Sequence, residues 1–234
     1  KPTRWALKQM VVTPENAQSG LDPLQGAVLL HDGYDGRVLA MANVPALTRL
    51  RTAATTVLAT LTLAPPHPAV IAIVGAGVQG QAHARAMRDM FPQARLRIWG
   101  RRPERAEEIA NQVSGECVPT IREAVEGADV VCTVTAAHQP ILERSWLKPG
   151  CHLNAVGSST PAARELDGAT LAAATLFVDR RHAALNESGD VMGAIRDGAI
   201  TEAHIAAELG EVLDEVHPGR TSDGEFTLFK SLGF

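Results

Sequence analysis

The sequence predicts an α/β fold in which a doubly wound parallel sheet is accompanied by a smaller α+β domain. Three observations predict it. From residue 66 onward, short apolar runs that suit buried strands alternate with segments compatible with helices. One of these runs, residues 69–74, leads directly into a glycine-rich turn. Before residue 65, short strand-like runs are separated by Asn, Asp and Gly, which is typical of an antiparallel element.

The first part of the chain, residues 1–65, is predicted to form the smaller domain. Its strand-like runs are residues 8–12, 27–31 and 37–42. Asp35-Gly36 lies between the last two runs and is a hairpin signal. A helix rich in Ala, Thr and Leu is expected over residues 47–63.

Pro65-Pro66 ends this helix and marks a domain boundary. The second domain is expected to cover residues 66–200. Residues 201–234 then form a C-terminal segment, in which the pattern of Thr201 to Glu215 predicts an amphipathic helix.

The glycine-rich turn reads Gly75-Ala76-Gly77-Val78-Gln79-Gly80 and has the spacing G-x-G-x-x-G. Gly75 permits the tight turn, Gly77 lets backbone N–H groups approach a pyrophosphate, and Gly80 lets a helix pack closely on the strand. The helix would begin near Val78 and Gln79 and direct its N-terminus at the anion. A strand, this turn and a helix in succession predict a dinucleotide site of the Rossmann type.

The end of the next strand indicates which dinucleotide binds. Residues 95–99 form this strand, and Gly100-Arg101-Arg102 follow it. A site selective for NAD usually has an acidic residue here for the ribose 2′-OH, whereas guanidinium groups pair with a 2′-phosphate. The sequence therefore favours NADP(H). NAD(H) remains open, because Arg101 and Arg102 could also be solvated loop charges.

The rest of the second domain continues the alternation of strands and helices. Strands are expected at residues 129–134, 152–157 and 176–179, and helices at residues 104–113 and 120–125, the latter with a capping box from Thr120 and Glu123. In such sheets ligands bind beyond the carboxyl ends of the strands. Residues at those ends are candidate ligand contacts: Thr135, Val156, Gly157, Ser158, Ser159, Thr160 and Asp179.

Composition excludes several classes of function. The net charge of −4 argues against a nucleic-acid surface, which needs clustered basic residues. No apolar stretch reaches the roughly 18 residues of a membrane span, and the opening residues do not show the charged-then-apolar pattern of a leader, so neither feature is expected. Cys117, Cys132 and Cys151 are isolated and show no metal-ligand spacing, so no metal site is expected. A reduced, cytoplasmic protein is the expectation.

Several segments, in their order and spacing, resemble the ornithine cyclodeaminase and mu-crystallin family over essentially the whole chain. The segments L-T-R-L-R-T-A-A and F-K-S-L-G are the most specific of them. They are residues 47–54, the turn at 75–80, and residues 99–101, 154–157, 161–167, 178–179, 187–190 and 229–233. The resemblance implies further sequence on both sides: residues ahead of Lys8 that complete the first domain, and a C-terminal helix that returns to it.

The family resemblance also implies roles for individual residues. The first domain supplies a homodimer interface and a clamp for a substrate carboxylate, to which Arg51 and Lys8 correspond. A guanidinium gives bidentate geometry to a carboxylate and an ammonium adds a mobile charge. Lys230 and Ser231 correspond to residues near the nicotinamide. Asp179 either tunes protonation of the substrate or has a structural hydrogen-bonding role.

One departure from the family pattern separates the possible activities. Family cyclodeaminases carry a Gly-Gly-Asp-Cys-Pro type segment whose Asp orients the substrate amine, but here Ser159 stands in its place. A hydroxyl cannot supply the charge of a carboxylate or act as a comparable base. The resemblance therefore implies NAD(P)H-dependent reduction of a cyclic 2-imino acid, such as Δ1-pyrroline-2-carboxylate or Δ1-piperideine-2-carboxylate. Ornithine cyclodeamination, alanine dehydrogenation and ligand binding without catalysis, as in mu-crystallin, remain alternatives.

Overall fold

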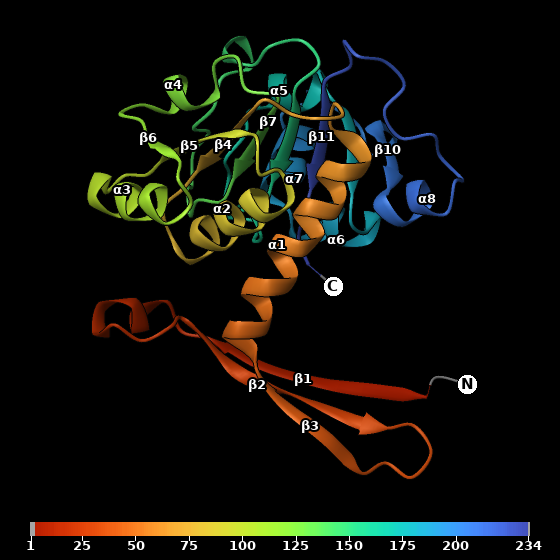
Figure 1. Cartoon of the computed structure of the whole chain (residues 1–234). Coiled ribbons are helices and arrows are strands. Elements are labelled where there is room, and N and C mark those ends of the chain that lie inside the picture. Colours follow the sequence, from red (N-terminus) through yellow and green to blue (C-terminus); the bar gives the residue numbers. More distant parts are fainter. Residues whose placement is uncertain (1–2, 234) are drawn as a thin grey trace. The chain divides into compact units, whose positions relative to one another are not determined.

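The computed structural model describes residues 3–233 (Figure 1). By its internal contacts the chain divides into two compact units, Lys1–Arg51 and Thr52–Phe234. The division lies within the helix α1 (Val44–Leu63), which corresponds to the helix expected over residues 47–63. The domain boundary expected at residue 65 follows the end of this helix.

The first unit is built on a three-stranded antiparallel sheet with the order β1-β2-β3. Its strands are β1 (Arg4–Val12), β2 (Leu24–Asp32) and β3 (Val38–Asn43), and the short 3₁₀ helix η1 (Pro14–Ser19) follows β1. Gly36, with φ of +78°, allows the turn between β2 and β3, and the Asp32 N–H donates to the Arg37 carbonyl. The expected strands and hairpin are thus confirmed.

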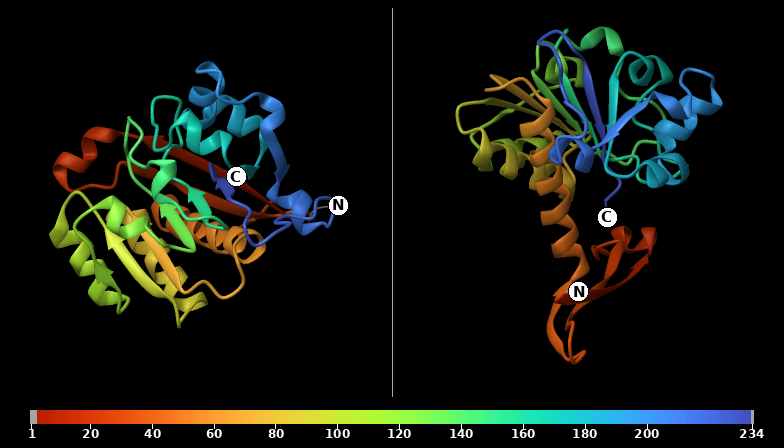
Figure 2. Two further views of the ribbon diagram at one scale, coloured as in Figure 1. Left: turned by 90° about the horizontal axis from the view of Figure 1, so that it is seen from above. Right: turned by 90° about the vertical axis from the view of Figure 1, so that its right-hand side faces the viewer.

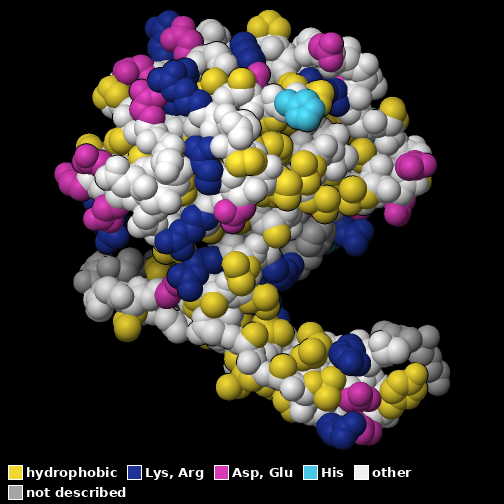
Figure 3. Space-filling view, in the orientation of Figure 1, with side chains coloured by type: hydrophobic (Ala, Val, Ile, Leu, Met, Phe, Trp, Pro, Cys, Tyr) yellow, Lys and Arg dark blue, Asp and Glu magenta, His cyan; other side chains and the backbone are white. Residues whose placement is uncertain are grey.

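Side chains alternate between the two faces of this sheet. Leu7, Leu29 and Met41 are cross-strand partners and therefore share one face. Lys8 is one residue along from Leu7 and so lies on the opposite face. All nine residues of β1 are exposed, and hydrophobic side chains gather over this unit in Figure 3. The sheet therefore has little core of its own within the chain.

The second unit contains an eight-stranded sheet with the order β10-β9-β11-β8-β7-β4-β5-β6, and its paired strands are parallel. The strands are β4 (Val70–Val74), β5 (Arg95–Trp99), β6 (Glu116–Cys117), β7 (Val130–Thr133), β8 (His152–Ala155), β9 (Thr175–Val178), β10 (Ile205–Glu208) and β11 (Thr227–Lys230). The doubly wound α/β fold predicted from the sequence is confirmed.

Helices cover both faces of this sheet (Figure 2). They are α2 (Val78–Met90), α3 (Pro103–Gln112), α4 (Ile121–Val125), α5 (Gly168–Ala172), α6 (Arg181–Glu187), α7 (Gly189–Arg196) and α8 (Leu209–Leu213), with 3₁₀ turns η2 (Arg144–Trp146) and η3 (Glu202–His204). One core lies under α1, α2 and α3, where Val57, Met87 and Ile109 pack on the sheet. The other lies under α4, α5 and α7, around Leu153 and Val191.

The amphipathic helix expected over Thr201–Glu215 is wrong. The segment instead forms η3, the edge strand β10 and the short helix α8. Ile205 and Ala207 are buried because β10 pairs in parallel with β9, and this pairing overrides the helix propensity of an Ala- and Glu-rich segment. Helix α8 begins only after Glu208, which forms a capping box with Glu211.

Candidate functional site

The carboxyl ends of β4, β7, β8 and β11 lie at one edge of the parallel sheet. β4 and β7 are neighbours in space, but the chain runs from β4 outward to β5 before it returns to β7. Strand order therefore reverses between them, and this is the position at which open α/β sheets bind ligands. The turns and loops that follow these strands form the candidate site.

The glycine-rich turn between β4 and α2 has the geometry expected of it. Gly75 has a φ of +130°, which favours glycine. A Cβ atom on Gly80 would lie 1.9 Å from the carbonyl oxygen of Gly75, so only glycine allows the helix to approach the turn. A Cβ atom on Gly77 would meet nothing within 4 Å. Gly77 therefore borders open space, which is where a pyrophosphate would lie.

The turn also has free hydrogen-bonding capacity suited to a dinucleotide. Gly77 is the N-cap of α2 and provides no side-chain cap for the first N–H groups of the helix, which are available to an anion. The Oε1 atom of Gln79 is buried and has no partner among the described residues. Both features fit the pyrophosphate and polar edges of NAD(P).

The loop after β5 brings two arginines beside this turn. A Cβ atom on Gly100 would lie 2.4 Å from the Cβ of Ala76, so the end of β5 approaches the turn closely. Arg101 and Arg102 follow directly, both are exposed, and Arg102 is the N-cap of α3. No acidic residue stands at this strand end, so the local charge is positive.

Beneath this edge lies a buried carboxylate that the sequence analysis did not single out. Glu165 is fully buried, and its Oε1 accepts from the N–H and the hydroxyl of Thr135, each at 2.7 Å. Its Oε2 accepts from the Thr133 hydroxyl at 2.9 Å and from the Gly157 N–H at 2.8 Å. One side chain thus ties the turn after β7 to the turn after β8. Burial raises the pKa of Glu165, and nearby Lys230 opposes the rise.

A second buried carboxylate continues this cluster. Asp190 is fully buried at the start of α7, and its Oδ1 accepts from the N–H groups of Glu165 and Leu166 at 2.8 and 3.0 Å. Its Oδ2 faces the ammonium of Lys230 at 3.4 Å. The hydroxyl of Ser158 accepts from the Asp190 N–H at 3.1 Å. We refer to Glu165, Asp190 and Lys230 as the buried charge cluster.

Lys230 lies within the buried charge cluster, whereas the family resemblance implies a position near the nicotinamide. Its side chain has no exposed surface, and Ser231 beside it is only 2% exposed. The position at the end of β11 agrees with the expectation, but the ammonium is enclosed by protein. A direct contact with a nicotinamide therefore stays a prediction, and the enclosure favours an indirect role for Lys230.

Asp179 directly follows β9 and is buried. Its Oδ1 accepts from the Arg180 N–H at 2.9 Å, and its Oδ2 accepts from the N–H groups of Leu232 and Gly233, each at 2.7 Å. Burial raises the pKa of Asp179, and these amides oppose the rise. Because both oxygens bind backbone, the geometry favours the structural role over the catalytic one.

The residues expected to contact the substrate are surface residues. Ser159 and Thr160, in the loop after β8, are exposed, in contrast to buried Ser158. Lys8 lies exposed on β1, and Arg51 is a half-buried residue of α1 at the end of the first unit. Neither of these two belongs to the second unit, in which the other candidates are found.

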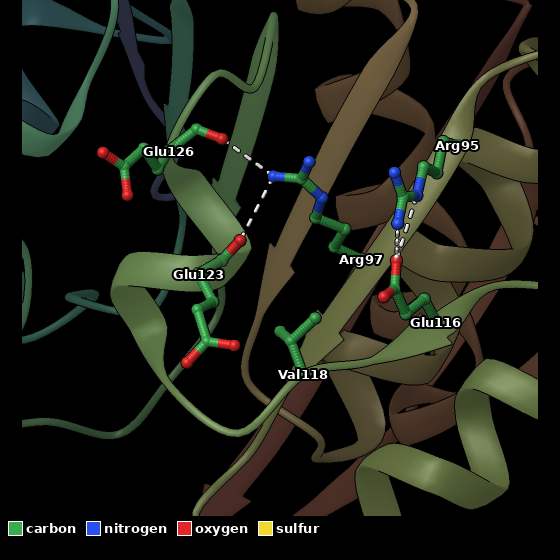
Figure 4. A pocket seen from close by; sticks show the side chains of 6 residues that line it. All are labelled: Arg95, Arg97, Glu116, Val118, Glu123 and Glu126. Atoms are coloured by element: carbon green, nitrogen blue, oxygen red, sulfur yellow. Dashed lines mark hydrogen bonds and ion pairs between the residues drawn. The ribbon is translucent and has the colours of Figure 1, made fainter.

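A pocket elsewhere in the second unit has a structural explanation. It is lined by Arg95, Arg97, Glu116, Val118, Glu123 and Glu126 (Figure 4). Arg95 pairs with the Glu116 carboxylate, and Arg97 donates to the carbonyls of Glu123 and Glu126 at the end of α4. These cations are engaged, and Arg95 begins β5, so the pocket lies away from the carboxyl ends.

In residues 3–233, which the structure describes, every helix is too short or too polar to span a lipid bilayer. The same residues contain no group of three or more His, Cys, Asp or Glu side chains placed to hold a metal ion.

The missed residues were Glu165 and Asp190. Both lie in segments that carried the family resemblance, but a single charge in such a segment gives no sign of burial. The available signal was position, since Glu165 lies in the loop after β8 and Asp190 follows the N-cap Ser188 of α7.

The chain is similar to known proteins over most of its length. The model of the ornithine cyclodeaminase/mu-crystallin family matches residues 3–234. The mouse protein named ketimine reductase mu-crystallin is 44% identical over 211 residues, which are 89% of this chain and 64% of that protein. The chain thus spans less than two thirds of this relative's length. A Δ1-pyrroline-2-carboxylate reductase of Paracoccus denitrificans is 37% identical over 98% of this chain and 74% of its own length.

Solved structures show the same relationship. The Δ1-pyrroline-2-carboxylate reductase of Thermococcus litoralis, in complex with NADH and L-proline, superposes with a TM-score of 0.90 at 35% identity, covering 97% of this chain and 72% of that one. An archaeal alanine dehydrogenase dimer with bound NAD superposes with a TM-score of 0.93 at 28% identity, covering 100% and 73%. Together with the family match, these likenesses show that the chain belongs to the ornithine cyclodeaminase/mu-crystallin family.

Proposed function

We propose that the protein reduces a cyclic 2-imino acid, such as Δ1-pyrroline-2-carboxylate or Δ1-piperideine-2-carboxylate, to the corresponding L-amino acid with NAD(P)H. Relatives named ketimine reductase and Δ1-pyrroline-2-carboxylate reductase support this activity. So does the likeness to a reductase structure that holds NADH and L-proline.

One observation carries the choice among activities of the family. Ser159 is exposed in the loop after β8, and residues 157–161 contain no carboxylate. A cyclodeaminase needs an acid to orient the amine of its substrate and to move protons. Asp179 is a poor substitute, because three backbone N–H groups occupy its two oxygens. Reduction of an imine requires no such acid.

The proposed roles of the residues follow from their chemistry. Arg51 and Lys8 bind the substrate carboxylate and thereby orient the C=N bond. Ser159 and Thr160 contact the substrate as neutral hydrogen-bonding groups. The nitrogen proton is already present on the iminium or comes from water. When bound, the nicotinamide supplies the hydride.

The proposal also covers the choice of cofactor and the oligomeric state. We infer that NADP(H) is preferred, because Arg101 and Arg102 are exposed beside the turn and an acid is missing there. We also infer a homodimer formed through the first unit, which the alanine dehydrogenase dimer among the similar structures supports. That structure also makes alanine dehydrogenation the second candidate activity.

The test follows NADPH and NADH oxidation with both cyclic imino acids, in parallel with ammonia release from L-ornithine and pyruvate-dependent NADH oxidation with ammonia. Rapid oxidation with an imino acid, lost in Arg51→Ala by about 100-fold or more in kcat/KM, is the expected result. Arg49→Ala, in the same helix, is the matched control. Proline and ammonia from ornithine would overturn the proposal, and turnover with pyruvate alone would favour the second candidate.

A further inference from the structure

The buried charge cluster does not touch open space, yet it connects the parts of the chain that border the candidate site. Its members come from three places: Glu165 from the loop after β8, Asp190 from the start of α7 and Lys230 from the end of β11. Each has no exposed surface. The Lys230 ammonium faces Asp190 at 3.4 Å and is a nearby charge to Glu165, so the cluster has two buried carboxylates and one cation and is costly unless other groups compensate for its charge.

The compensation comes from the loops of the site itself. The two carboxylates together accept from the N–H groups of Thr135, Gly157, Glu165 and Leu166. They also accept from two threonine hydroxyls, on Thr133 and Thr135. The turns after β7 and β8 therefore satisfy the charges, and in return the charges hold these turns at fixed distances. A carboxylate of this kind binds more strongly than a neutral acceptor, because its hydrogen bonds are charge-assisted.

The turn after β8 lies in close contact with both the Glu165 carboxylate and the turn after β7. A Cβ atom on Gly157 would lie 2.1 Å from the Thr135 carbonyl and 2.5 Å from Oε1 of Glu165. The two turns and the carboxylate are thus packed closely, with no room for a side chain at residue 157. Ser159, exposed two residues later, is carried by the same turn, and its neighbour Ser158 is anchored to the N–H of Asp190.

We propose that Glu165, Asp190 and Lys230 are positioning residues for the proposed reduction. They set the spacing between the turns after β7 and β8, which border the nicotinamide end of the cofactor site, without touching substrate or cofactor themselves. This inference rests on the proposed function for the reaction that the cluster affects. The expected effect of the cluster on NAD(P)H binding can be tested without that reaction.

The first test compares Glu165→Gln with Asp167→Ala. Gln keeps the size of the side chain but places an NH₂ group where two donors already converge, so it disturbs both turns. Asp167 lies two residues away and caps α5 by accepting from the Thr170 N–H at 2.8 Å. Its removal lowers stability without touching the turns. The control therefore separates loss of stability from loss of positioning.

For Glu165→Gln we expect kcat to fall by roughly 10- to 100-fold, because misplacement by a fraction of an ångström affects the geometry of hydride transfer most. The Kd for NAD(P)H should rise by about 10-fold, and the KM for the imino acid should change by less than about threefold. Asp167→Ala should lower Tm while kcat and Kd remain unchanged. Titration of intrinsic fluorescence with NADPH and NADH measures Kd without turnover.

Thr133→Val is a milder variant in case Glu165→Gln does not fold. It removes one of the four donors to Glu165 and replaces the hydroxyl by a methyl group of similar size. We expect changes of the same sign and smaller size. Lys230→Met and Asp190→Asn, singly and combined, test the ion pair: the double variant should bind NAD(P)H better than Lys230→Met alone, since it leaves one unmatched buried carboxylate instead of two.

The outcomes separate the two proposals. If the folded Glu165→Gln and Thr133→Val proteins keep the wild-type Kd and kcat, the positioning role is overturned. If the wild-type protein binds NAD(P)H but reduces no imino acid, the proposed function fails, while the changes in Kd still decide the positioning role. A wild-type protein that binds neither cofactor overturns both.

Discussion

The Nε2 atom of His83 in α2 lies 3.0 Å from the hydroxyl oxygen of Thr56 in α1, and both residues are fully buried. The Nδ1 atom of His83 lies 2.8 Å from the carbonyl oxygen of Gln79, in the first turn of α2. One imidazole therefore links α1 to the residues of the glycine-rich turn. Burial lowers the pKa of His83 to about 4, so the ring is neutral in the folded protein near pH 7.

The first prediction is that the protein loses stability in mild acid. Burial also lowers the pKa of His152 to about 3. The unfolded chain takes up protons on these rings below about pH 6.5, whereas the folded protein does so only below about 4 and 3. The free energy of unfolding therefore falls as the pH drops from 6.5, by on the order of 3 kcal/mol for His83 alone by pH 4.

Urea unfolding between pH 7.5 and 4.5 checks this prediction. His83→Gln should be less stable at pH 7.5, because the links to Thr56 and Gln79 are weakened, but it should lose less stability on acidification. His182→Gln, at an exposed position of α6, is the control and should follow the wild-type slope. An unchanged slope in His83→Gln would contradict the prediction.

The second prediction uses the contrast between two glycines of the same turn. Gly80→Ala should destabilise the protein by about 3 kcal/mol, because its Cβ would meet the Gly75 carbonyl at 1.9 Å. Gly77→Ala should cost less than about 1 kcal/mol, since its Cβ would meet nothing and its φ of −88° suits alanine.

The affinity for NAD(P)H should fall more in Gly77→Ala than in Gly80→Ala, the reverse of the order for stability. The methyl group of Gly77→Ala would occupy the space proposed for the pyrophosphate, and we expect the Kd for NAD(P)H to rise by at least about 10-fold. Fluorescence titration and thermal unfolding of both variants measure the two effects. Wild-type affinity in a well-folded Gly77→Ala protein would place the dinucleotide elsewhere.

Much of the second unit could be predicted from the sequence because its signals are local. Gly75, Gly77 and Gly80 occupy the expected conformations because the turn between a strand and a helix restricts the backbone strongly. The capping of α4 by Thr120, which accepts from the Glu123 N–H at 3.1 Å, was predictable for the same reason.

What could not be predicted depends on contacts between distant segments. Nothing local distinguishes Ile205–Glu208 from a helix, and only its pairing with β9 makes it a strand. Likewise, Glu165 and Lys230 are 65 positions apart, and the burial of their charges follows from the sheet order, in which β11 lies beside β8. Neither periodicity nor spacing carries that information.

The third prediction concerns the choice of cofactor. Replacing both Arg101 and Arg102 by Ala should raise the Kd for NADPH by about 10- to 100-fold, which corresponds to the loss of charge-assisted hydrogen bonds to the 2′-phosphate. The Kd for NADH should change by less than about threefold, since NADH lacks this phosphate.

Arg105→Ala is the matched control for that variant. Arg105 lies in α3, the helix that follows Arg102, and pairs with exposed Glu108 at 3.5 Å, so its loss removes one positive charge without removing a candidate phosphate contact. Fluorescence titrations at two salt concentrations separate general attraction from specific binding. Equal losses for NADPH and NADH in the double variant would show that the two arginines do not select the cofactor.

The last prediction concerns the sheet of the first unit. Met41 is 75% exposed and Leu7 is 54% exposed on the face that they share with Leu29. A three-stranded sheet needs an apolar face that packs against another element for its stability, so a partner should cover this face, and we propose a second copy of the chain. Met41→Glu should then shift the protein from dimer to monomer, because the interface would bury an unpaired charge.

Size-exclusion chromatography with light scattering measures this shift. Val216→Glu is the control, since Val216 is 76% exposed, much like Met41, but belongs to the second unit. It should leave the dimer intact. A wild-type protein that is monomeric at tens of micromolar, a concentration well above the Kd of most stable dimers, would rule out the second copy as the partner of this face. The face formed by Leu7, Leu29 and Met41 would then require a different partner.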